Sequence, residues 1–170
     1  MTAIERVWAM PNKNTFSIKP IRELIDRYLF PNITIIDPFA NSNKIATITN
    51  DLDRAYDTDY HMDALDFLEM WKAKTVDMVL FDPPYSPRQV SESYKKLGMS
   101  VNMQTTQASY WSNMKREIAR IIKPDGIVIT CAWNSGGIGK TLGFVLEEVL
   151  LVPHGGWHND TIITVERKNK

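Results

Sequence analysis

Four residues at the end of an apolar segment, Asp82-Pro83-Pro84-Tyr85, combine a carboxylate, backbone carbonyls and an aromatic ring. They follow Val76–Phe81, whose composition predicts a buried strand. Two consecutive prolines cannot continue a central strand, because neither has an N–H to donate. The turn therefore holds these groups at the carboxyl edge of a sheet, where open α/β folds bind their ligands. A trio of this kind is suited to gripping the amino group of a planar base.

Other acidic residues follow the neighbouring apolar segments. Asp37 and Asp51 each come after a short β-rich run, and Asp63 precedes a helical pattern. Because parallel strands end at the same edge of a sheet, these carboxylates are expected to face one crevice. An acid after the second strand commonly accepts hydrogen bonds from a ribose diol, whereas any one aspartate also suits a turn or an N-cap.

The elements that must position these carboxylates alternate along the chain. The spacing of apolar residues predicts helices over residues 20–28, 63–72 and 109–122. Runs rich in β-branched residues predict strands over residues 33–36, 44–49, 76–81, 127–133, 148–152 and 161–167. Further segments are interpreted as a helix at 142–149, a turn at 124–126 and a polar stretch at 86–107. The alternation predicts an α/β fold with a mostly parallel sheet and helices on both faces.

Length and composition predict one globular domain over residues 1–170. The chain is 44% hydrophobic and 24% charged, which is enough apolar material for a core. Its 20 basic and 20 acidic residues give a net charge of zero, so contact with nucleic acid would need a local patch. A single cysteine, Cys131, and the lack of a secretory signal or a span of ~20 apolar residues predict a cytoplasmic protein with no membrane contact.

Taken together, these residues resemble the S-adenosylmethionine-dependent amino-methyltransferases of DNA, of the adenine-N6 type. The family's signature Asp-Pro-Pro-Tyr stands at residues 82–85, and its motif Asp-Pro-Phe-x-Gly-x-Gly is similar to residues 37–43. Its helix-opening Lys-Pro-x-x-Leu-Ile segment is similar to residues 19–25. Asp51 and Asp63 are similar to its ribose-binding and adenine-binding acids. The matches follow the family's order from residue 16 to about residue 86.

The resemblance implies a Rossmann-like methyltransferase fold with a seven-stranded, mostly parallel sheet. It implies S-adenosylmethionine as the cofactor, in a site formed by Phe16, Lys19, Asp37, Pro38, Phe39, Ala40, Asn41, Ser42, Asp51 and Asp63. The chain departs from the motif where Asn41 and Asn43 replace its two glycines. Glycine permits a positive φ at such positions, and asparagine is the next best residue for a left-handed conformation.

The resemblance also implies methyl transfer to the exocyclic amine of adenine in DNA, with Asp82, Pro83, Pro84 and Tyr85 as the catalytic residues. That amine is a weak nucleophile because its lone pair is delocalised into the ring. The Asp82 carboxylate and the Pro83 carbonyl would accept its two hydrogens and localise the pair for in-line attack. Pro84 would stiffen the turn. Tyr85 would stack on a base that has left the duplex, although an aromatic ring beside a turn also commonly serves packing.

Polar and basic residues directly after this turn are expected to contact the substrate. Basic and aromatic side chains together suit phosphates and bases, although the same segment also fits a solvated helix and loop. A predicted hairpin around residues 153–160 is expected near the substrate cleft. The candidate substrate-binding residues are Ser86, Arg88, Tyr94, Lys95, Lys96, His158 and Asn159.

Two other patterns are weaker. Residues 136–141 are similar to a Gly-x-x-x-x-Gly-Lys-Thr phosphate loop, but Asn134 stands where the first glycine is required. We therefore expect a strand-to-helix turn there, with Lys140 available to face a phosphate. His154, His158 and Asp160 carry metal-ligating groups, but two intervening glycines argue against a helical pair of ligands. No metal site is expected.

The chain has no segment long enough for a separate target-recognition domain, so it resembles the minimal enzymes of phages and mobile elements. Little sequence specificity of its own is expected, and a homodimer or a partner protein would have to supply more. DNA is the expected partner and RNA the alternative. The same turn also fits a cytosine-N4 methyltransferase of DNA, or a guanine-N2 or adenine-N6 methyltransferase of RNA. A catalytically inactive binding module with this fold is the alternative of another class.

Overall fold

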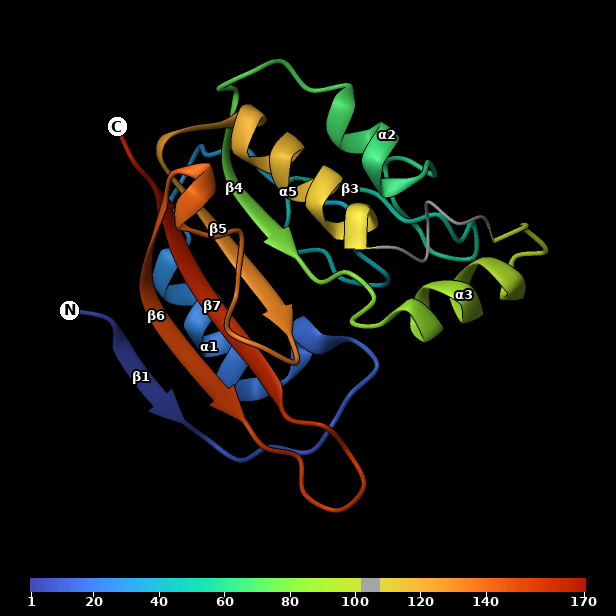
Figure 1. The fold of residues 1–170 in the computed structure, drawn as a ribbon, viewed down its shortest axis with the longest axis horizontal. Coiled ribbons are helices and arrows are strands. Elements are labelled where there is room, and N and C mark those ends of the chain that lie inside the picture. The colour runs from blue at the N-terminus through green and yellow to red at the C-terminus, as the bar shows by residue number, and fades with distance from the viewer. Residues whose placement is uncertain (102–107) are drawn as a thin grey trace.

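A computed structural model describes residues 1–101 and 108–170. Its centre is a sheet of seven strands in the order β1-β6-β7-β5-β4-β2-β3 (Figure 1). The strands are β1 (Ala3–Arg6), β2 (Ile35–Asp37), β3 (Ile48–Thr49), β4 (Val76–Phe81), β5 (Ile122–Ala132), β6 (Phe144–Val152) and β7 (Thr161–Lys168). Only β7 runs against its neighbours, β5 and β6; the other pairs are parallel. The predicted seven-stranded, mostly parallel sheet is confirmed.

Helices cover both faces of this sheet, as predicted. The described helices are α1 (Lys19–Tyr28), α2 (Ala64–Glu69), α3 (Pro87–Lys96) and α5 (Ala108–Ile121). Alternate residues of β4 divide between the two faces: Met78 and Leu80 pack with α1, whereas Val79 and Phe81 pack with α2 and α5. Both faces of the central strands are therefore buried, which explains their continuous apolar sequences.

Six strands end at the same edge of the sheet, because β1 to β6 all run in one direction. The segments that follow these strand ends, and the connection between β6 and β7, therefore gather along that edge. Figure 1 shows this edge facing α3 and the connection between β6 and β7. The candidate catalytic turn lies there, directly after β4.

The segment at 142–149 was the largest error in the predicted elements. A short 3-10 turn, η2 (Lys140–Leu142), ends at Gly143 with a left-handed φ of 84°, and β6 follows as a strand. Pairing decides this outcome, because β6 lies between β1 and β7 and donates and accepts hydrogen bonds on both sides. The sequence pattern also missed β1, an exposed edge strand.

Two predicted boundaries also changed. The run at 44–49 forms a strand only at β3, because the Thr47 hydroxyl takes the place of backbone pairing and bonds both the N–H and the carbonyl of Ile35 at 2.8 Å. The predicted turn at 124–126 lies inside β5 as a bulge, where Asp125 has a φ of 62°. No helix within the described ranges is long and apolar enough to cross a membrane.

Candidate active site

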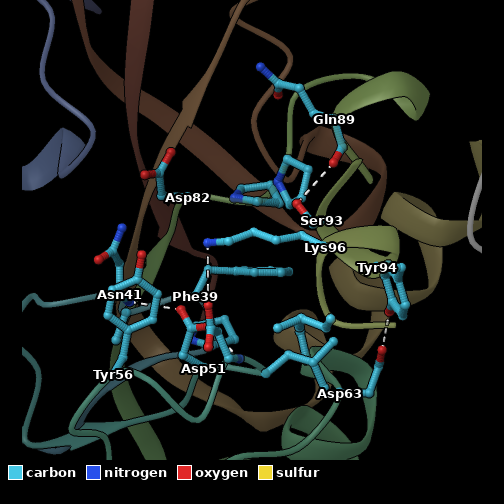
Figure 2. Close-up of a pocket in the computed structure, with 18 of the residues that line it drawn as sticks. Phe39, Asn41, Asp51, Tyr56, Asp63, Asp82, Gln89, Ser93, Tyr94 and Lys96 are labelled. Atoms are coloured by element: carbon cyan, nitrogen blue, oxygen red, sulfur yellow. Dashed lines mark hydrogen bonds and ion pairs between the residues drawn. The ribbon is translucent and has the colours of Figure 1, made fainter. Parts of the chain in front are cut away.

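A cavity of about 490 Å³ opens at the carboxyl edge of the sheet. Residues of α3 lie opposite Asn41, Asp51 and Asp63 across it (Figure 2). The cavity gathers side chains from the ends of β2, β3 and β4, as the order of acidic residues predicts. The predicted site residues that line it are Phe16, Pro38, Phe39, Ala40, Asn41, Asp51, Asp63, Asp82, Pro83, Pro84, Tyr85, Tyr94 and Lys96.

The loop after β2 accommodates both asparagines that replace glycine. Asn41 has a φ of 53°, so it adopts the left-handed conformation that the missing glycine would supply. Its side-chain oxygen accepts a hydrogen bond from the N–H of Ser42 at 2.7 Å. Asn43 is buried without a positive φ, and its side-chain oxygen accepts from the N–H of Ile45 at 2.9 Å. Only the first glycine position therefore needs an unusual backbone, and asparagine meets that need.

Asp51 ties two loops of the cavity together. Its carboxylate accepts hydrogen bonds from the N–H of Asn41 and the N–H of Asp53, both at 2.9 Å. Burial raises the pKa of Asp51, and these two bonds oppose the rise. A carboxylate has about four acceptor positions, so Asp51 can accept further bonds from a ligand in the cavity. The Lys96 side chain reaches across the cavity from α3 and places its Nζ 3.5 Å from Asp53 Oδ2 (Figure 2).

Asp63 begins α2 and is engaged on both oxygens. As the N-cap, it accepts a hydrogen bond from the N–H of Leu65 at 3.0 Å, which confirms the predicted cap. Its other oxygen accepts from the hydroxyl of Tyr94 on α3 (Figure 2). Burial and this bond raise the pKa of Tyr94, so the hydroxyl stays protonated and donates. Tyr94 thereby fastens α3 over the cavity.

Asp37 lies beneath the cavity and is fully buried. One of its oxygens accepts from the N–H of Phe39 at 3.0 Å, and the other has no hydrogen-bond partner among the described residues. Burial raises its pKa well above the usual range, and the nearby carboxylates of Asp82 and Asp51 add to the rise. Asp37 therefore fixes the start of the loop after β2 through Phe39, and it does not line the cavity itself.

The candidate catalytic turn is braced by bonds along its length. The carbonyl of Pro84 accepts from Trp111 Nε1 at 2.8 Å, and the N–H of Tyr85 donates to Gln89 Oε1 at 2.6 Å. The hydroxyl of Tyr85 donates to Asp82 Oδ1 at 2.5 Å. Burial raises the pKa of Asp82 to about 6, although hydrogen bonds from Tyr85 and Thr15 lower it. The turn is thus braced by these bonds, and the pKa of its carboxylate lies above the ordinary range of aspartate.

Tyr85 separates the first cavity from a second one of about 280 Å³. His158 and Asn159 line this second cavity, so the structure places both predicted substrate residues beside the turn. Two tryptophans that no sequence pattern singled out line it as well: Trp157, and Trp133, whose ring meets Tyr85 edge-on with the ring centres 5.7 Å apart. The available signal was their positions: Trp133 is the last residue of a predicted strand, and Trp157 lies inside a predicted hairpin.

His154 has a structural role at the base of this second cavity. Its Nδ1 lies 2.8 Å from the carbonyl oxygen of Ala9 and its Nε2 lies 2.7 Å from Thr161 Oγ1. The ring is buried and both nitrogens are engaged. The side chain therefore ties the chain after β1 to the connection between β6 and β7.

Several predicted site residues lie outside both cavities. Lys19 is exposed and its Nζ lies 3.9 Å from Glu23 Oε1, while Arg88 is exposed and bonds Glu92 at 2.8 Å. Ser86 caps α3 by accepting from the N–H of Gln89 at 3.3 Å. Ser42 and Lys95 are exposed on the surface. The part of the polar segment at 102–107 lies outside the described residues. The roles predicted for these residues stay predictions.

The backbone of the glycine-rich segment after β5 binds a carboxylate side chain of the same protein. The N–H groups of Ile138 and Gly139 donate to the two carboxylate oxygens of Glu166, at 2.5 and 3.0 Å. Gly137 adopts a left-handed φ of 52° against the same carboxylate. These N–H groups are therefore committed to Glu166, and a phosphate would have to displace it.

No protein-family model matches the chain, and no curated protein matches its sequence. Solved structures share its fold. The 1,6-didemethyltoxoflavin-N1-methyltransferase of Burkholderia thailandensis superposes with a TM-score of 0.58 at 11% identity, over 89% of this chain and 78% of that one. TrmN of Thermus thermophilus gives 0.54 at 16% identity, over 89% of this chain and 49% of that one.

A SAM-dependent methyltransferase of Methanosarcina mazei gives a TM-score of 0.53 at 10% identity, over 86% of this chain and 97% of that one. At such low identities the likenesses concern the backbone. They show that the chain has a Rossmann-like methyltransferase fold, as its sequence predicts.

Proposed function

We propose that this chain, which has the methyltransferase fold, transfers a methyl group from S-adenosylmethionine to the exocyclic amine of adenine in DNA. One observation carries the proposal. The rigid turn of Asp82 and Tyr85 stands between an acid-lined cavity and a second cavity lined by aromatic and amide side chains. A methyl donor in the first and a base in the second would meet at Tyr85, whose hydroxyl is bonded to Asp82.

The first cavity suits a cationic donor. Five carboxylates line it, together with two lysines: Asp51, Asp53, Asp63, Asp82 and Glu92, with Lys13 and Lys96. S-adenosylmethionine carries a sulfonium and an ammonium group against one carboxylate, so its net charge is positive. A volume of about 490 Å³ lies within the usual range of ligand pockets, about 300–1,000 Å³. The Burkholderia neighbour was crystallised with S-adenosylhomocysteine, the product of such a donor.

Different carboxylates would bind different parts of this donor. Asp51, with free acceptor positions, would bind the ribose diol. Asp63 would accept from the amino group of the donor's adenine, in exchange for the hydroxyl of Tyr94 or beside it. Phe39 and Ala40 supply apolar surface between them. When bound, the donor supplies an electrophilic methyl group on a sulfonium.

The turn prepares the base for attack. The Asp82 carboxylate and the Pro83 carbonyl would accept hydrogen bonds from the two amine hydrogens, which directs the nitrogen lone pair out of the ring system. The new nitrogen–carbon bond forms as the carbon–sulfur bond breaks, and the extra proton leaves the nitrogen afterwards. Asp82 need not be a strong base, because the amine becomes acidic only after attack. Fixed positioning is the main contribution of such a turn.

The test is to identify the product. Unmethylated DNA and RNA are incubated separately with the protein and S-adenosylmethionine, digested to nucleosides and analysed by mass spectrometry. N6-methyladenine in DNA is expected, and the Asp82→Ala variant should not form it. An exposed carboxylate outside the site, Asp57, offers the matched control in Asp57→Ala. N4-methylcytosine, or a product confined to RNA, would contradict the proposal. Calorimetric titration with S-adenosylmethionine that shows no binding would favour an inactive module.

A further inference from the structure

Three of the five tryptophans are exposed around the second cavity. Trp8, Trp133 and Trp157, which we call the aromatic platform, have exposed fractions of 59%, 40% and 103%. They come from three separate segments that meet at the carboxyl edge of the sheet: the chain after β1, the chain after β5 and the connection between β6 and β7. Two of them, Trp133 and Trp157, also line the cavity beside Tyr85.

The platform is held together by backbone bonds. The N–H of Ala9 donates to the carbonyl of Pro153 at 3.2 Å, and His154 holds the carbonyl of Ala9. Figure 1 shows the chain after β1 passing along the connection between β6 and β7. A Cβ placed on Gly155 would lie 3.5 Å from Trp8 Nε1, so Trp8 lies against the same connection that carries Trp157. Trp8 and Trp157 therefore lie on segments with fixed contacts, and Trp133 joins Trp157 in lining the second cavity.

The stability of the fold does not explain why these three rings are exposed. A side chain as exposed as Trp157 buries no apolar area in the folded chain and so contributes little to its stability. Exposed apolar groups gathered on one surface are typical of binding sites. The side chains between the rings are polar: Asn12, His158 and Asn159 line the same cavity. Aromatic rings mixed with amides suit a ligand that stacks and also forms hydrogen bonds, such as a nucleobase.

The segment that carries Trp8 has a charge that favours a polyanion. The 17 residues from 6 to 22 contain four basic side chains and no acidic one, although the whole chain has zero net charge. All four are exposed: Arg6, Lys13, Lys19 and Arg22. Lys19 and Arg22 contact acidic residues one turn further along α1, whereas none of the ion pairs of the described residues involves Arg6 or Lys13. Trp8 lies between these two cations in the sequence.

We propose that the aromatic platform binds an unpaired DNA strand. Bases would stack on Trp8 and Trp157, phosphates would meet Arg6 and Lys13, and the strand would lead one base into the second cavity beside Tyr85. A duplex hides the faces of its bases, so exposed stacking rings favour a single strand. The choice of DNA over RNA rests on the proposed function. The platform would provide substrate binding without a separate recognition domain, and with little preference for sequence.

Binding of a labelled single-stranded DNA of about 12 nucleotides, measured by fluorescence anisotropy without the methyl donor, tests this. We expect Trp8→Ala and Trp157→Ala each to weaken binding about 5- to 150-fold, the effect of losing one stacked base. Phe30→Ala is the matched control, because Phe30 is 61% exposed and lies before β2, at the opposite edge of the sheet. It should bind as the parent does. Duplex DNA of the same sequence should bind more weakly than the single strand.

Three outcomes would overturn the proposal: equal binding of single-stranded DNA by the tryptophan variants, tighter binding of the duplex, or tighter binding of RNA of the same sequence. Light scattering is measured in parallel. If the parent protein is a dimer and the Trp8→Ala and Trp157→Ala variants are monomers that bind DNA normally, the platform is instead a contact between two copies of the chain. Retained melting temperature and donor binding would exclude misfolding.

The outcomes also separate this proposal from the proposed function. If the tryptophan variants lose binding of the single strand and the parent protein forms no N6-methyladenine, the proposed strand binding is supported and the proposed reaction is contradicted. If the tryptophan variants bind DNA normally and form N6-methyladenine at the normal rate, the proposed strand binding is contradicted and the proposed reaction is not.

Discussion

The two cavities on either side of Tyr85 are built in opposite ways. The first is lined by carboxylates that hydrogen bonds tie to their own loops, such as Asp51 between the loops after β2 and β3. The second is lined by exposed aromatic and amide side chains from segments far apart in the sequence. Fixed acceptors select a ligand by its hydrogen bonds and charge, whereas exposed rings accept many bases. Under the proposed function, this difference corresponds to a selective site for the donor beside a permissive site for the substrate.

The largest effect is expected at Asp82, which lines the first cavity and is bonded to Tyr85, the turn residue that lines both. Asp82→Ala should lower the rate of methyl transfer about 10²- to 10³-fold, because the variant cannot accept a hydrogen from the amine. Donor affinity should stay within about threefold, since the proposed donor contacts are those of Asp51 and Asp63. Single-turnover rates and calorimetric titration measure the two quantities. Loss of donor binding as well would mean that the turn organises the first cavity rather than the reaction.

The raised pKa of Asp82 adds a pH dependence. With a folded pKa of about 6, transfer should fall as the pH drops below about 6, because protonation removes the acceptor. The unfolded chain releases this proton near pH 3.9, so the contribution of Asp82 to stability decreases between about pH 4 and 6 and stays constant above. Asp82→Asn should therefore be more stable than the parent at pH 7 but not at pH 4. Urea unfolding at both pH values checks this, and an equal difference at both would contradict it.

A smaller effect, confined to the first cavity, is expected at Asp51. Asp51→Asn replaces one accepting oxygen by an amide nitrogen that cannot accept, and removes a negative charge that lines the first cavity. Donor affinity should fall about 10- to 100-fold. Binding of single-stranded DNA should not change, since Asp51 does not line the second cavity. Calorimetry and anisotropy measure the pair of affinities, and a parallel loss of both would show that the two cavities are coupled.

Tyr94 tests whether α3 restrains the first cavity. In Tyr94→Phe, Asp63 loses the hydroxyl that occupies one oxygen, so that oxygen becomes available to the donor. We expect donor affinity to rise a few-fold and the free energy of unfolding to fall by about 1.5–3 kcal/mol, the usual contribution of a hydrogen bond to a charged group. Weaker donor binding in this variant would instead make the Tyr94 hydroxyl a group that positions Asp63.

The smallest effect concerns the backbone of the first cavity. Asn41→Ala should destabilise the protein by about 1–2 kcal/mol, because alanine is strained at a φ of 53°, whereas Asn41→Gly should be nearly neutral. Thermal unfolding of the two variants compares them directly. Equal destabilisation by glycine and alanine would show that the bond from Ser42 to the Asn41 side chain matters more than the backbone conformation.

Much of the first cavity could be predicted because short stretches of sequence determine the positions of the residues that line it. A buried strand followed by Asp82, or a helix preceded by Asp63, is determined by residues within a few positions of each other, and parallel strands then bring the strand ends together. The sequence by itself therefore determined the fold class, the turn and the order of the acidic residues that line the first cavity. It also determined the left-handed position that Asn41 can adopt.

The second cavity and the closure of the first depended on contacts between distant residues. Residues 144–152 became a strand because β1 and β7 pair with both of its edges, although a helix was the interpretation of residues 142–149. Tyr94 meets Asp63 across 31 positions, and Trp8 lies beside Gly155. No local pattern encodes these distances, since hydrogen bonding and packing between remote segments are decided only when the whole chain folds. The tertiary structure alone thus placed α3 over the first cavity and assembled the aromatic platform.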